Sequence, residues 1–477
     1  MTYYFRVDSS FKIGAGHIKR CIRLADQLDA KNVEFICKDL DGNLNNIIKK
    51  KYKLHLINNK SWQIDLSQTI RIINNNNNNN KILFVDNYEI GKSWEKKIKR
   101  YVKKIIVIDD IPRKHYCDYL INPNWYFQKN KLFFKNYKNC KNLMFGPNYS
   151  LINYNNINTR KKSSQLSIFF GGSDNKNITL FFLKKITSLI SFKINVIILN
   201  KKKKDVDLIK NYLKTYKNKK IKLFKNLNSL SKIFQNTRFF VGASGSTTWE
   251  RLLYKIPSLI ISTTNDQKNI NKGLSKNKLQ ISLSFSDLNS KSNLKRKIQQ
   301  LILDEKKLIQ RQRNLIDGKG LLRIKLALSS FDKKDVGFKH ASEEDFGFLF
   351  FCINQPIAIK SRFKSTTIAL DEHRKWFNNI LKSSRNFLFM ITVKDINVGF
   401  IRYDLFNNYF AIDIYIENIF SERGVSRIVM SKTMHHMKKK TGVKIFRAYV
   451  KKKNLISINF FKSLKFNYNQ SYFEKKI

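Results

Sequence analysis

The stretch Gly14-Ala15-Gly16-His17 places two glycines and a histidine between a predicted strand, Tyr3 to Val7, and a predicted helix. The helix is indicated by apolar residues that recur at helical spacing from Ile18 to Leu28. Glycines let the backbone approach a ligand closely, and a helix N-terminus attracts anions. The helix dipole opposes a positive charge on His17, so we expect a neutral imidazole that accepts a proton at about pH 7. His17 is therefore a candidate general base; the alternative is that it only begins the helix.

A second corner of small residues runs from Gly242 to Thr248, between another predicted strand and helix. Its backbone N–H groups would suit a pyrophosphate, and Ser246 and Thr247 can add hydroxyl donors. The lysine of a Walker loop is absent. Thr247-x-x-Glu250 also has the pattern of a capping box, which favours a helix cap over a ribose-binding role for Glu250.

Strand-like and helix-like segments alternate through both halves of the first 330 residues, which predicts parallel sheets covered by helices. In such sheets ligands gather at the carboxyl ends of the strands. Six polar residues follow predicted strands and are expected to converge on the edge that holds His17: Asp8, Asp86, Tyr88, Asp109, Asp110 and Asn122.

The composition of the chain excludes several classes of function. The net charge of +57 comes mainly from lysines spread over every segment, and Asn, Ile and Phe are also abundant, as A/T-rich codons would produce. We therefore expect no specific nucleic-acid partner.

The five cysteines lack the spacing of metal ligands, which predicts no metal site and reduced thiols in a cytoplasmic protein. No apolar run approaches the roughly 20 residues of a membrane span, and the sequence indicates no oligomeric state.

Six ordered motifs together resemble a known family: Arg6-x-Asp8, Ile13 to Cys21, Val85 to Tyr88, Ile108 to Asp110, Phe170 to Asp174, and Gly245 to Glu250. They are similar to the PseG-like UDP-sugar hydrolases of pseudaminic acid biosynthesis, which resemble MurG-type glycosyltransferases. The resemblance implies a GT-B fold, with a lobe at 1–155 that carries the catalytic histidine and a lobe at 156–330 that binds UDP. It also implies hydrolysis of UDP-2,4-diacetamido-2,4,6-trideoxy-β-L-altropyranose to UDP and the free sugar. Single displacement predicts inversion.

The resemblance also implies roles for single residues. His17 would be catalytic. Substrate would be bound by Arg6, Asp8, Gly16, Arg20, Tyr88, Asn265, Asp266 and Gln267, and UDP by Gly172, Ser246, Thr247 and Glu250. The family has Asn-Gln where this chain reads Asn265-Asp266-Gln267. The alternative functions are a GT-B glycosyltransferase, which would need an acceptor, and a basic nucleic-acid binder, which rests on charge alone.

Residues 336–477 form a separate predicted domain with an α+β pattern, which resembles GNAT acetyltransferases and most closely the PseH-like N-acetyltransferases. A pyrophosphate, that of acetyl-CoA, is expected on the loop from Ser421 to Ser426. The resemblance implies binding by Arg423, Gly424, Ser426 and Asn454. Phe461 stands where the family has a proton-donating tyrosine.

Three histidines of this last third are interpreted as surface residues. His373 is expected on the surface of a helix, although it is also a candidate for contact with the sugar. His435 and His436 are expected on a solvated helix face and not in a metal site, because adjacent residues of a helix do not share one side. The two resemblances together predict a bifunctional enzyme that acetylates a UDP-4-amino sugar and then releases UDP from the product.

Overall fold

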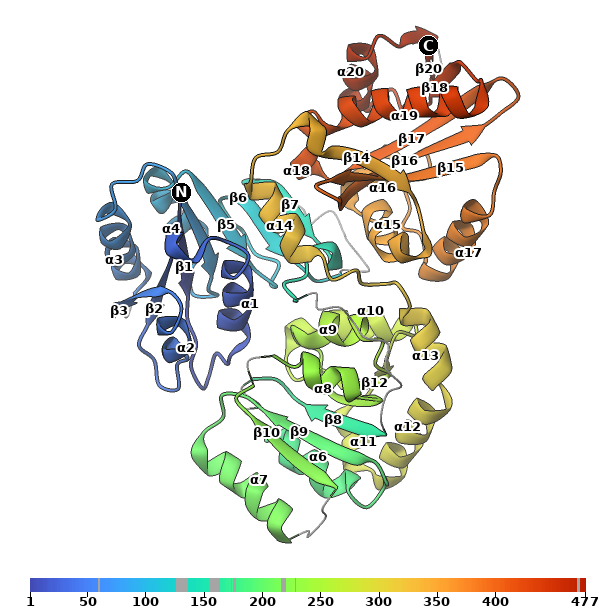
Figure 1. Ribbon diagram of the computed structural model, residues 1–477. Coiled ribbons are helices and arrows are strands. Elements are labelled where there is room, and N and C mark those ends of the chain that lie inside the picture. The colour runs from blue at the N-terminus through green and yellow to red at the C-terminus, as the bar shows by residue number, and fades with distance from the viewer. Residues whose placement is uncertain are drawn as a thin grey trace. The chain divides into compact units, whose positions relative to one another are not determined.

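The protein is described here from a computed structural model, shown in Figure 1. The structure describes residues 1–58, 61–125, 136–153, 164–172, 174, 177–215, 220–227, 229–469 and 472–477. Most of the polar boundary expected between residues 153 and 164 therefore lies outside the described residues. By its internal contacts the chain divides into two compact units, Met1–Arg313 and Asn314–Ile477. The lobe boundary at 155/156 and the domain boundary between 330 and 336 stay predictions.

The first sheet of unit 1 has seven parallel strands in the order β3-β2-β1-β4-β5-β6-β7. Its central strands are buried on both faces, which explains their nearly continuous apolar sequences. The strands in chain order are β1 (Thr2–Val7), β2 (Val33–Lys38), β3 (Lys53–Ile57), β4 (Lys81–Asp86), β5 (Lys104–Ile108), β6 (Cys117–Asn122) and β7 (Cys140–Phe145). The helices are α1 (Gly16–Ala25), η1 (Ala30–Asn32), α2 (Asn45–Lys49), α3 (Trp62–Asn74), α4 (Lys92–Ile98), η2 (Lys99–Tyr101) and η3 (Pro147–Tyr149).

The second sheet of unit 1 is also parallel, with six strands in the order β10-β9-β8-β11-β12-β13. Its strands are β8 (Gln165–Phe169), β9 (Lys193–Ile198), β10 (Ile221–Lys225), β11 (Phe239–Ala243), β12 (Ser258–Ile261) and β13 (Ile281–Ser282). The helices are α6 (Ile178–Ile186), α7 (Lys203–Thr215), α8 (Ser231–Asn236), α9 (Thr247–Leu253), α10 (Asn265–Lys276), α11 (Phe285–Asn289), α12 (Lys291–Leu303) and α13 (Glu305–Gln312). Apolar side chains from both strands and helices form one core on a face of this sheet.

Unit 2 contains a mixed sheet in the order β14-β15-β16-β17-β18-β20-β19, in which only β17 and β18 pair in parallel. Its strands are β14 (Val336–His340), β15 (Asn386–Val393), β16 (Ile396–Leu405), β17 (Tyr409–Ile416), β18 (Ile445–Ala448), β19 (Asn467–Asn469) and β20 (Tyr472–Lys476). The helices are α14 (Gly320–Leu328), η4 (Lys333–Asp335), η5 (Glu343–Asp345), α15 (Phe346–Ile353), α16 (Pro356–Ser361), α17 (Leu370–Leu381), α18 (Asn418–Ser421), α19 (Val425–Thr441) and α20 (Leu455–Ser463).

The predicted fold class, two parallel α/β lobes followed by an α+β domain, is confirmed. The sequence analysis missed strands at sheet edges, such as β7 and β14, because their exposed residues interrupt the apolar pattern. Within the described ranges, no helix combines the length and the apolar character needed to cross a membrane.

Candidate active site

His17 is the second residue of α1, directly after the turn in which Gly14 takes φ +83°. Its Nδ1 lies 2.6 Å from Oδ1 of Asp86, the last residue of β4. Strands β1 and β4 run side by side, with Val7 opposite Asp86, so the turn into α1 starts level with this carboxylate. An ionised carboxylate only accepts hydrogen bonds, so Nδ1 carries a proton and Nε2 is the nitrogen left to act as a base.

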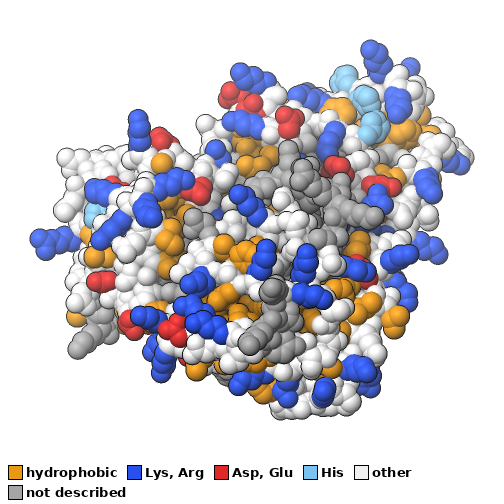
Figure 2. Space-filling model, turned by 60° about the horizontal axis from the view of Figure 1, so that its bottom comes forward, with side chains coloured by type: hydrophobic (Ala, Val, Ile, Leu, Met, Phe, Trp, Pro, Cys, Tyr) orange, Lys and Arg blue, Asp and Glu red, His pale blue; other side chains and the backbone are white. Residues whose placement is uncertain are grey.

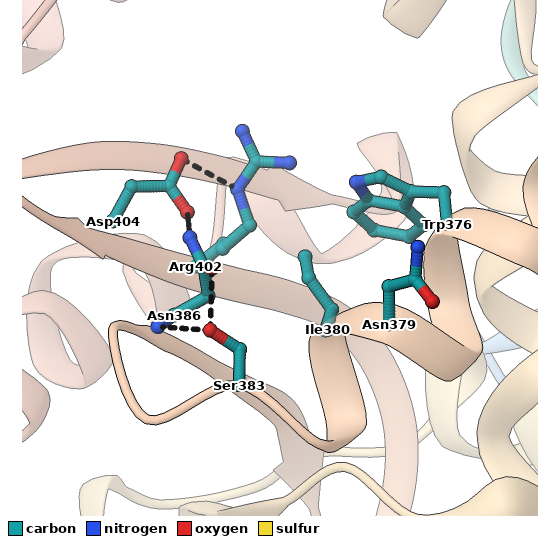
Figure 3. Close-up of a pocket in the computed structure, with 7 residues that line it drawn as sticks. All are labelled: Trp376, Asn379, Ile380, Ser383, Asn386, Arg402 and Asp404. Atoms are coloured by element: carbon teal, nitrogen blue, oxygen red, sulfur yellow. Dashed lines mark hydrogen bonds and ion pairs between the residues drawn. The ribbon is translucent and has the colours of Figure 1, made fainter.

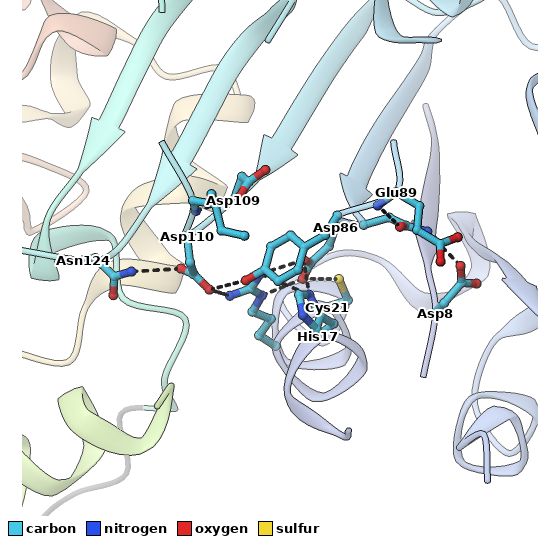
Figure 4. Close-up of polar contacts among 12 residues, drawn as sticks. Asp8, His17, Cys21, Asp86, Glu89, Asp109, Asp110 and Asn124 are labelled. Carbon is cyan, nitrogen blue, oxygen red and sulfur yellow. Dashed lines mark hydrogen bonds and ion pairs between the residues drawn. The ribbon is translucent and has the colours of Figure 1, made fainter. Parts of the chain in front are cut away.

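Arg20, one turn further along α1, holds in place the Asp86 carboxylate that lies beside His17 in Figure 4. Its Nε and Nη2 donate to the two oxygens of Asp86 at 2.6 Å each, and its Nη1 pairs with Asp110. Burial by itself raises the pKa of Asp86, but the charges of Arg20 and His17 and their hydrogen bonds lower it overall. Asp86 is therefore a fixed negative charge behind the imidazole. Arg20, with 6% of its surface exposed, is a positioning residue here and not part of an open binding surface.

The contact with Asp86 changes the electrostatic argument for His17. The prediction from sequence considers only the helix dipole, which disfavours the imidazolium. The Asp86 carboxylate is a second charged group and lies in direct contact with the ring. The same carboxylate orients the ring, as the acid of a catalytic triad orients its histidine.

Arg6 and Asp8, both predicted to bind substrate, lie behind the site. Arg6 is fully buried and donates to Asp8 at 2.6 and 2.8 Å and to Asp65 at 2.6 Å. Asp8 also accepts from the Lys38 backbone N–H and from Asn87 Nδ2, each at 2.7 Å. Burial raises the pKa of Asp8, but the Arg6 charge and these hydrogen bonds lower it overall. The pair fixes the carboxyl end of β1 and contributes no free group to a ligand.

A cavity of about 780 Å³ opens beside His17. Among its lining residues are Phe11, Ile13, His17, Leu40, Tyr88 and Lys202. The Tyr88 ring stands edge-on to the imidazole, with 4.6 Å between the ring centroids, and its OH donates to Asp110 at 3.4 Å. Burial and the Asp110 charge raise the pKa of Tyr88, so the phenol stays protonated. Lys202 was missed by sequence analysis because it belongs to no motif and is one lysine among many.

The corners that carry Gly16 and Ser246 face each other within unit 1. A Cβ built on Gly16 would have Ser246 Oγ as its nearest neighbour, at 4.0 Å. A Cβ on Gly172 would lie 2.9 Å from the Ala15 backbone nitrogen, closer than real side chains approach, so residue 172 must be glycine. Arg23 of α1 and Glu250 of α9 form an ion pair at 2.5 Å beside this contact. The turn before α1 thus lies close to Gly172 and to the start of α9; that these segments share one site stays a prediction.

The second corner differs in detail from its prediction. Helix α9 begins at Thr247, its N-cap is Ser246, and no side chain caps it. The prediction of a capping box formed by Thr247 and Glu250 is therefore wrong. Glu250 instead reaches Arg23 with one oxygen. Three buried polar atoms of this corner have no hydrogen-bond partner among the described residues: Ser244 Oγ, Thr248 Oγ1 and Glu250 Oε2. Unpaired buried polar atoms cost about 1–3 kcal/mol each, and a bound ligand would remove that cost.

Asn265 and Gln267 lie at the start of α10, after the end of β12. Asn265 is exposed, whereas Gln267 Oε1 accepts from the Thr263 backbone N–H at 2.9 Å. The Gln267 carboxamide is therefore turned toward its own loop. The side chain of Asp266 lies outside the described part, so its predicted role stays a prediction.

The loop predicted from Ser421 to Ser426 is shorter in the structure, because α18 ends at Ser421 and α19 begins at Val425. Gly424, at its end, has φ +78° and open space where a side chain would be. It precedes α19, whose second residue is Ser426. Arg423 donates to the carbonyls of Leu326 and Ser329 and stacks on Phe331. Asn454, which the resemblance places on acetyl-CoA, is the N-cap of α20: its Oδ1 accepts from the Ser457 backbone N–H at 3.3 Å.

Strand β17 pairs with β18 only over Tyr409–Ala411, although it pairs with β16 as far as Ile416. Among the residues that the structure describes, the backbone of 412–416 therefore has no strand partner on its β18 side, which leaves N–H and C=O groups for a ligand. Sequence analysis did not find this feature, because pairing length is not visible in an apolar pattern.

The prediction that His373 lies on a helix surface is wrong. The ring is 1% exposed and packs among Phe346, Phe350 and Trp376. Burial, the main cause, lowers the pKa of His373 to about 3. His435 is exposed as expected, but the neighbouring His436 packs its ring against Phe389 of the sheet. Among the described residues no group of three or more His, Cys, Asp or Glu side chains is arranged to hold a metal ion.

Comparisons with known proteins agree with both resemblances. Residues 335–467 match the family model of the acetyltransferase (GNAT) domain. The UDP-2,4-diacetamido-2,4,6-trideoxy-beta-L-altropyranose hydrolase of Campylobacter jejuni is 28% identical over 296 residues, which are 60% of this chain and 100% of that protein. An uncharacterized protein of Methanocaldococcus jannaschii is 26% identical over 271 residues, 53% of this chain and 54% of that protein. The chain thus spans about half the length of this second relative.

Solved structures similar to this chain include spermidine N-acetyltransferase from Vibrio cholerae in complex with CoA and spermine, at 10% identity and a TM-score of 0.29. That match covers 30% of this chain and 96% of the other. A domain from Methanocaldococcus jannaschii matches at 18% identity and a TM-score of 0.28, over 30% of this chain and 98% of the other. The chain is a homologue of the Campylobacter hydrolase and carries a GNAT domain at its C-terminal end.

Proposed function

We propose that unit 1 hydrolyses UDP-2,4-diacetamido-2,4,6-trideoxy-β-L-altropyranose to UDP and the free sugar, with inversion, in pseudaminic acid biosynthesis. The observation that carries this proposal is the imidazole of His17, oriented by Asp86 at 2.6 Å and exposed to a cavity of about 780 Å³. The Campylobacter relative, aligned over its whole length, supports the choice of substrate.

In the proposed reaction, the bond between the anomeric carbon and the UDP oxygen breaks while a water oxygen bonds to the opposite face of that carbon. The water proton passes to Nε2 of His17, whose Nδ1 proton stays hydrogen-bonded to Asp86. UDP leaves with the electron pair of the broken bond. A general base of this kind contributes roughly 10²–10⁴-fold to the rate.

The leaving diphosphate would be held by the second corner, where Ser246 and Thr247 lie at the start of α9, together with Gly172 after β8. Its unpaired Ser244 and Thr248 hydroxyls and the free oxygen of Glu250 are groups that a nucleotide would satisfy. Tyr88 and Lys202, which line the cavity, would contact the sugar side.

The test is UDP release from the UDP-sugar in the absence of any acceptor. We expect release by the natural chain and a loss of at least about 100-fold in His17→Ala. The matched control is His55→Ala, since His55 also pairs with a carboxylate, Glu34, at 2.6 Å, but lies on β3 away from the cavity. Release that requires an acceptor sugar would indicate a glycosyltransferase and contradict the proposal.

Unit 2 is proposed to transfer an acetyl group from acetyl-CoA to the 4-amino group of a UDP-amino sugar, which supplies the substrate of unit 1. The residues fit the coenzyme: Gly424 leaves open space before the 17-residue helix α19, whose first N–H groups would bind the pyrophosphate. Ser426 lies on that first turn, and the unpaired edge of β17 would accept the amide groups of the pantetheine arm.

Acetyl-CoA would supply the activated acyl group, and the chain would bind and orient both substrates. Phe461 is buried and cannot donate a proton, so the departing thiolate would take its proton from water.

The measurement is acetyl transfer followed by mass spectrometry of the UDP-sugar. Transfer should persist in His17→Ala, because His17 belongs to the other unit. Both reactions are assigned to the cytoplasm, which the five free cysteines support.

A further inference from the structure

Two thiols of unit 1, those of Cys117 and Cys140, take no part in either proposed reaction. In the pocket of unit 2 drawn in Figure 3, the charged side chains already neutralise each other, since Arg402 Nε pairs with Asp404 at 3.0 Å. Two neighbouring thiols are different, because they can form a covalent bond with each other when an oxidant is present. The geometry of this pair is therefore examined for that chemistry.

Cys117 and Cys140 are the first residues of the neighbouring parallel strands β6 and β7, and they are paired directly opposite each other. Their side chains interact on the same face of the sheet. Neighbouring strands lie about 4.8 Å apart, within the range of about 4.4–6.8 Å between Cα atoms that a disulfide requires. Strand β7 is the last strand in the order of its sheet, so a small shift at Cys140 can close the bond without moving an inner strand.

The two thiols differ in their access to solvent. Cys117 is 4% exposed and belongs to the apolar core on one face of the sheet, whereas Cys140 is half-buried and packs against the edge of that core. The other three cysteines, Cys21, Cys37 and Cys352, are buried. Cys140 is therefore the thiol that a small reagent from solvent reaches first, and Cys117 is in place to react with it next.

A buried histidine favours the thiolate of Cys140. His115 Nδ1 lies 2.7 Å from Glu95 Oε1, and its Nε2 lies 3.2 Å from Asp109 Oδ2. Burial by itself lowers the pKa of His115, but the two carboxylates raise it overall to about 9, so the ring is a cation at neutral pH. The interaction with the Cys117 thiol lowers the pKa of Cys140, and the charge of His115 adds to this effect, although burial opposes it. A partly exposed thiol of lowered pKa next to a second thiol is typical of cysteines that sense oxidants.

We propose that Cys140 and Cys117 are an oxidisable pair, which hydrogen peroxide converts into a disulfide within the chain. The Cys140 thiolate attacks one peroxide oxygen and the O–O bond breaks. The departing hydroxide takes up the proton that the thiol had released and leaves as water, so that Cys140 becomes a sulfenic acid. The Cys117 sulfur then attacks the Cys140 sulfur, the S–O bond breaks, and the second hydroxide leaves as water with the Cys117 proton. Two thiols and one peroxide thus give one disulfide and two water molecules.

This pair lies apart from the proposed hydrolytic site. Cys117 and Cys140 stand at the amino ends of β6 and β7, whereas His17 contacts Asp86 at the carboxyl end of β4, which is the opposite edge of the same parallel sheet. Oxidation of the pair therefore requires no substrate at His17, and the inference does not rest on the proposed function.

The test uses the full chain, reduced and then freed of reductant. The chain is treated with hydrogen peroxide, denatured and alkylated with N-ethylmaleimide, and its peptides are identified by mass spectrometry. We expect two peptides joined through Cys117 and Cys140, which dithiothreitol separates, while Cys21, Cys37 and Cys352 carry the maleimide. In the native chain without peroxide, Cys140 should be alkylated at least about tenfold faster than these three buried thiols.

Three variants assign the two steps. Cys117→Ala removes the second thiol, so Cys140 should stop at the sulfenic acid, which dimedone traps. Cys140→Ser removes the first thiol, so Cys117 should stay reduced. The matched control is Cys37→Ala, the same truncation of a buried cysteine on β2 of the same sheet, and it should still form the disulfide.

Joined peptides in the natural chain and in Cys37→Ala, and their loss in the other two variants, support the proposal even if no UDP-sugar is ever hydrolysed. Oxidation of Cys140 to a sulfinic acid while Cys117 remains a thiol overturns it, because the second thiol would then be out of reach. Maleimide on all five cysteines after peroxide treatment, or a disulfide between two chains, also overturns it.

Discussion

At the scale of single residues, the chemistry of unit 1 depends on how four side chains share charge. His17 contacts Asp86 (Figure 4), Asp86 is held by two nitrogen donors of Arg20, and the third nitrogen of Arg20 pairs with Asp110. The carboxylate of Asp86 is fully buried in this network and its pKa is lowered, so it stays ionised over the whole range in which a histidine titrates. Asp86 is thus a positioning residue for His17, although the sequence analysis named it only as one polar residue at a strand end.

Replacing Asp86 by Asn tests this role. The change keeps the shape of the side chain, but it removes the charge and offers an N–H group where the imidazole needs an acceptor. We expect kcat for UDP release to fall by about 10²–10⁴-fold, with a much smaller change in KM, because Asp86 does not line the cavity. The measurement is the steady-state kinetics of UDP release.

Glu34→Gln is the control for Asp86→Asn, because it breaks the comparable contact of Glu34 with His55 on neighbouring strands. It should leave UDP release unchanged. A variant Asp86→Asn that raised KM and kept kcat would show that this carboxylate serves substrate binding instead.

At the scale of elements, the site depends on two strand-to-helix corners that approach each other within unit 1. The turn before α1 and the turn after β8 come so close that Gly172 has no room for a side chain beside the Ala15 backbone. The backbones of these two turns therefore pack directly against each other. The Arg23–Glu250 ion pair adds a contact between α1 and α9.

Substitution Gly172→Ala should separate these corners. Its Cβ would meet the Ala15 nitrogen at 2.9 Å, and backbone on both sides must move to relieve the contact. We expect UDP release to fall by at least about tenfold, because small displacements at a catalytic contact have large effects on rate. Gly91→Ala, whose Cβ would have its nearest neighbour at an ordinary 3.9 Å, is the control and should keep full activity. Full activity in Gly172→Ala would mean that this contact is not part of the working site.

At the scale of the whole molecule, the charge is distributed rather than gathered. Figure 2 shows Lys and Arg side chains scattered over the visible face, with Asp and Glu among them. A net charge of +57 still attracts polyanions at long range. Many of the basic side chains inside the fold are paired with carboxylates, as in the Arg6–Asp8 and Arg20–Asp86 contacts, and so add nothing to this attraction.

Binding to DNA should therefore be non-specific and limited to low salt. We expect the chain to shift two unrelated DNA duplexes equally at about 20 mM salt and to release both at about 150 mM, because such binding depends on counterion release. An electrophoretic mobility assay over a salt series provides the measurement. Sequence-dependent binding that persists at the higher salt would favour the nucleic-acid function that the charge alone suggests.

The local pattern of residues determined most of the architecture. Continuous apolar runs marked the buried parallel strands, and glycine-containing corners marked the start of α1 and the region of α9, because these signals are properties of neighbouring residues. The same patterns indicated His17 as the candidate base and, through the ordered motifs, the similarity to the hydrolase. Edge strands such as β7 were missed, since a strand with one open side needs no continuous apolar sequence.

Only the tertiary structure decided what the candidate residues contact. Arg6, Asp8 and Arg20 were predicted to meet substrate, yet they lie buried in ion pairs, and Asp65 and Asp86, which pair with the two arginines, are 59 and 66 positions away in the sequence. Glu250 was expected to cap its own helix and instead pairs with Arg23, 227 positions earlier in the numbering. His373 was expected at the surface and is buried among aromatic rings. The reason is the same in each case: the energy of a charged or polar side chain depends on the partners and solvent that folding places around it, and a one-dimensional pattern contains neither.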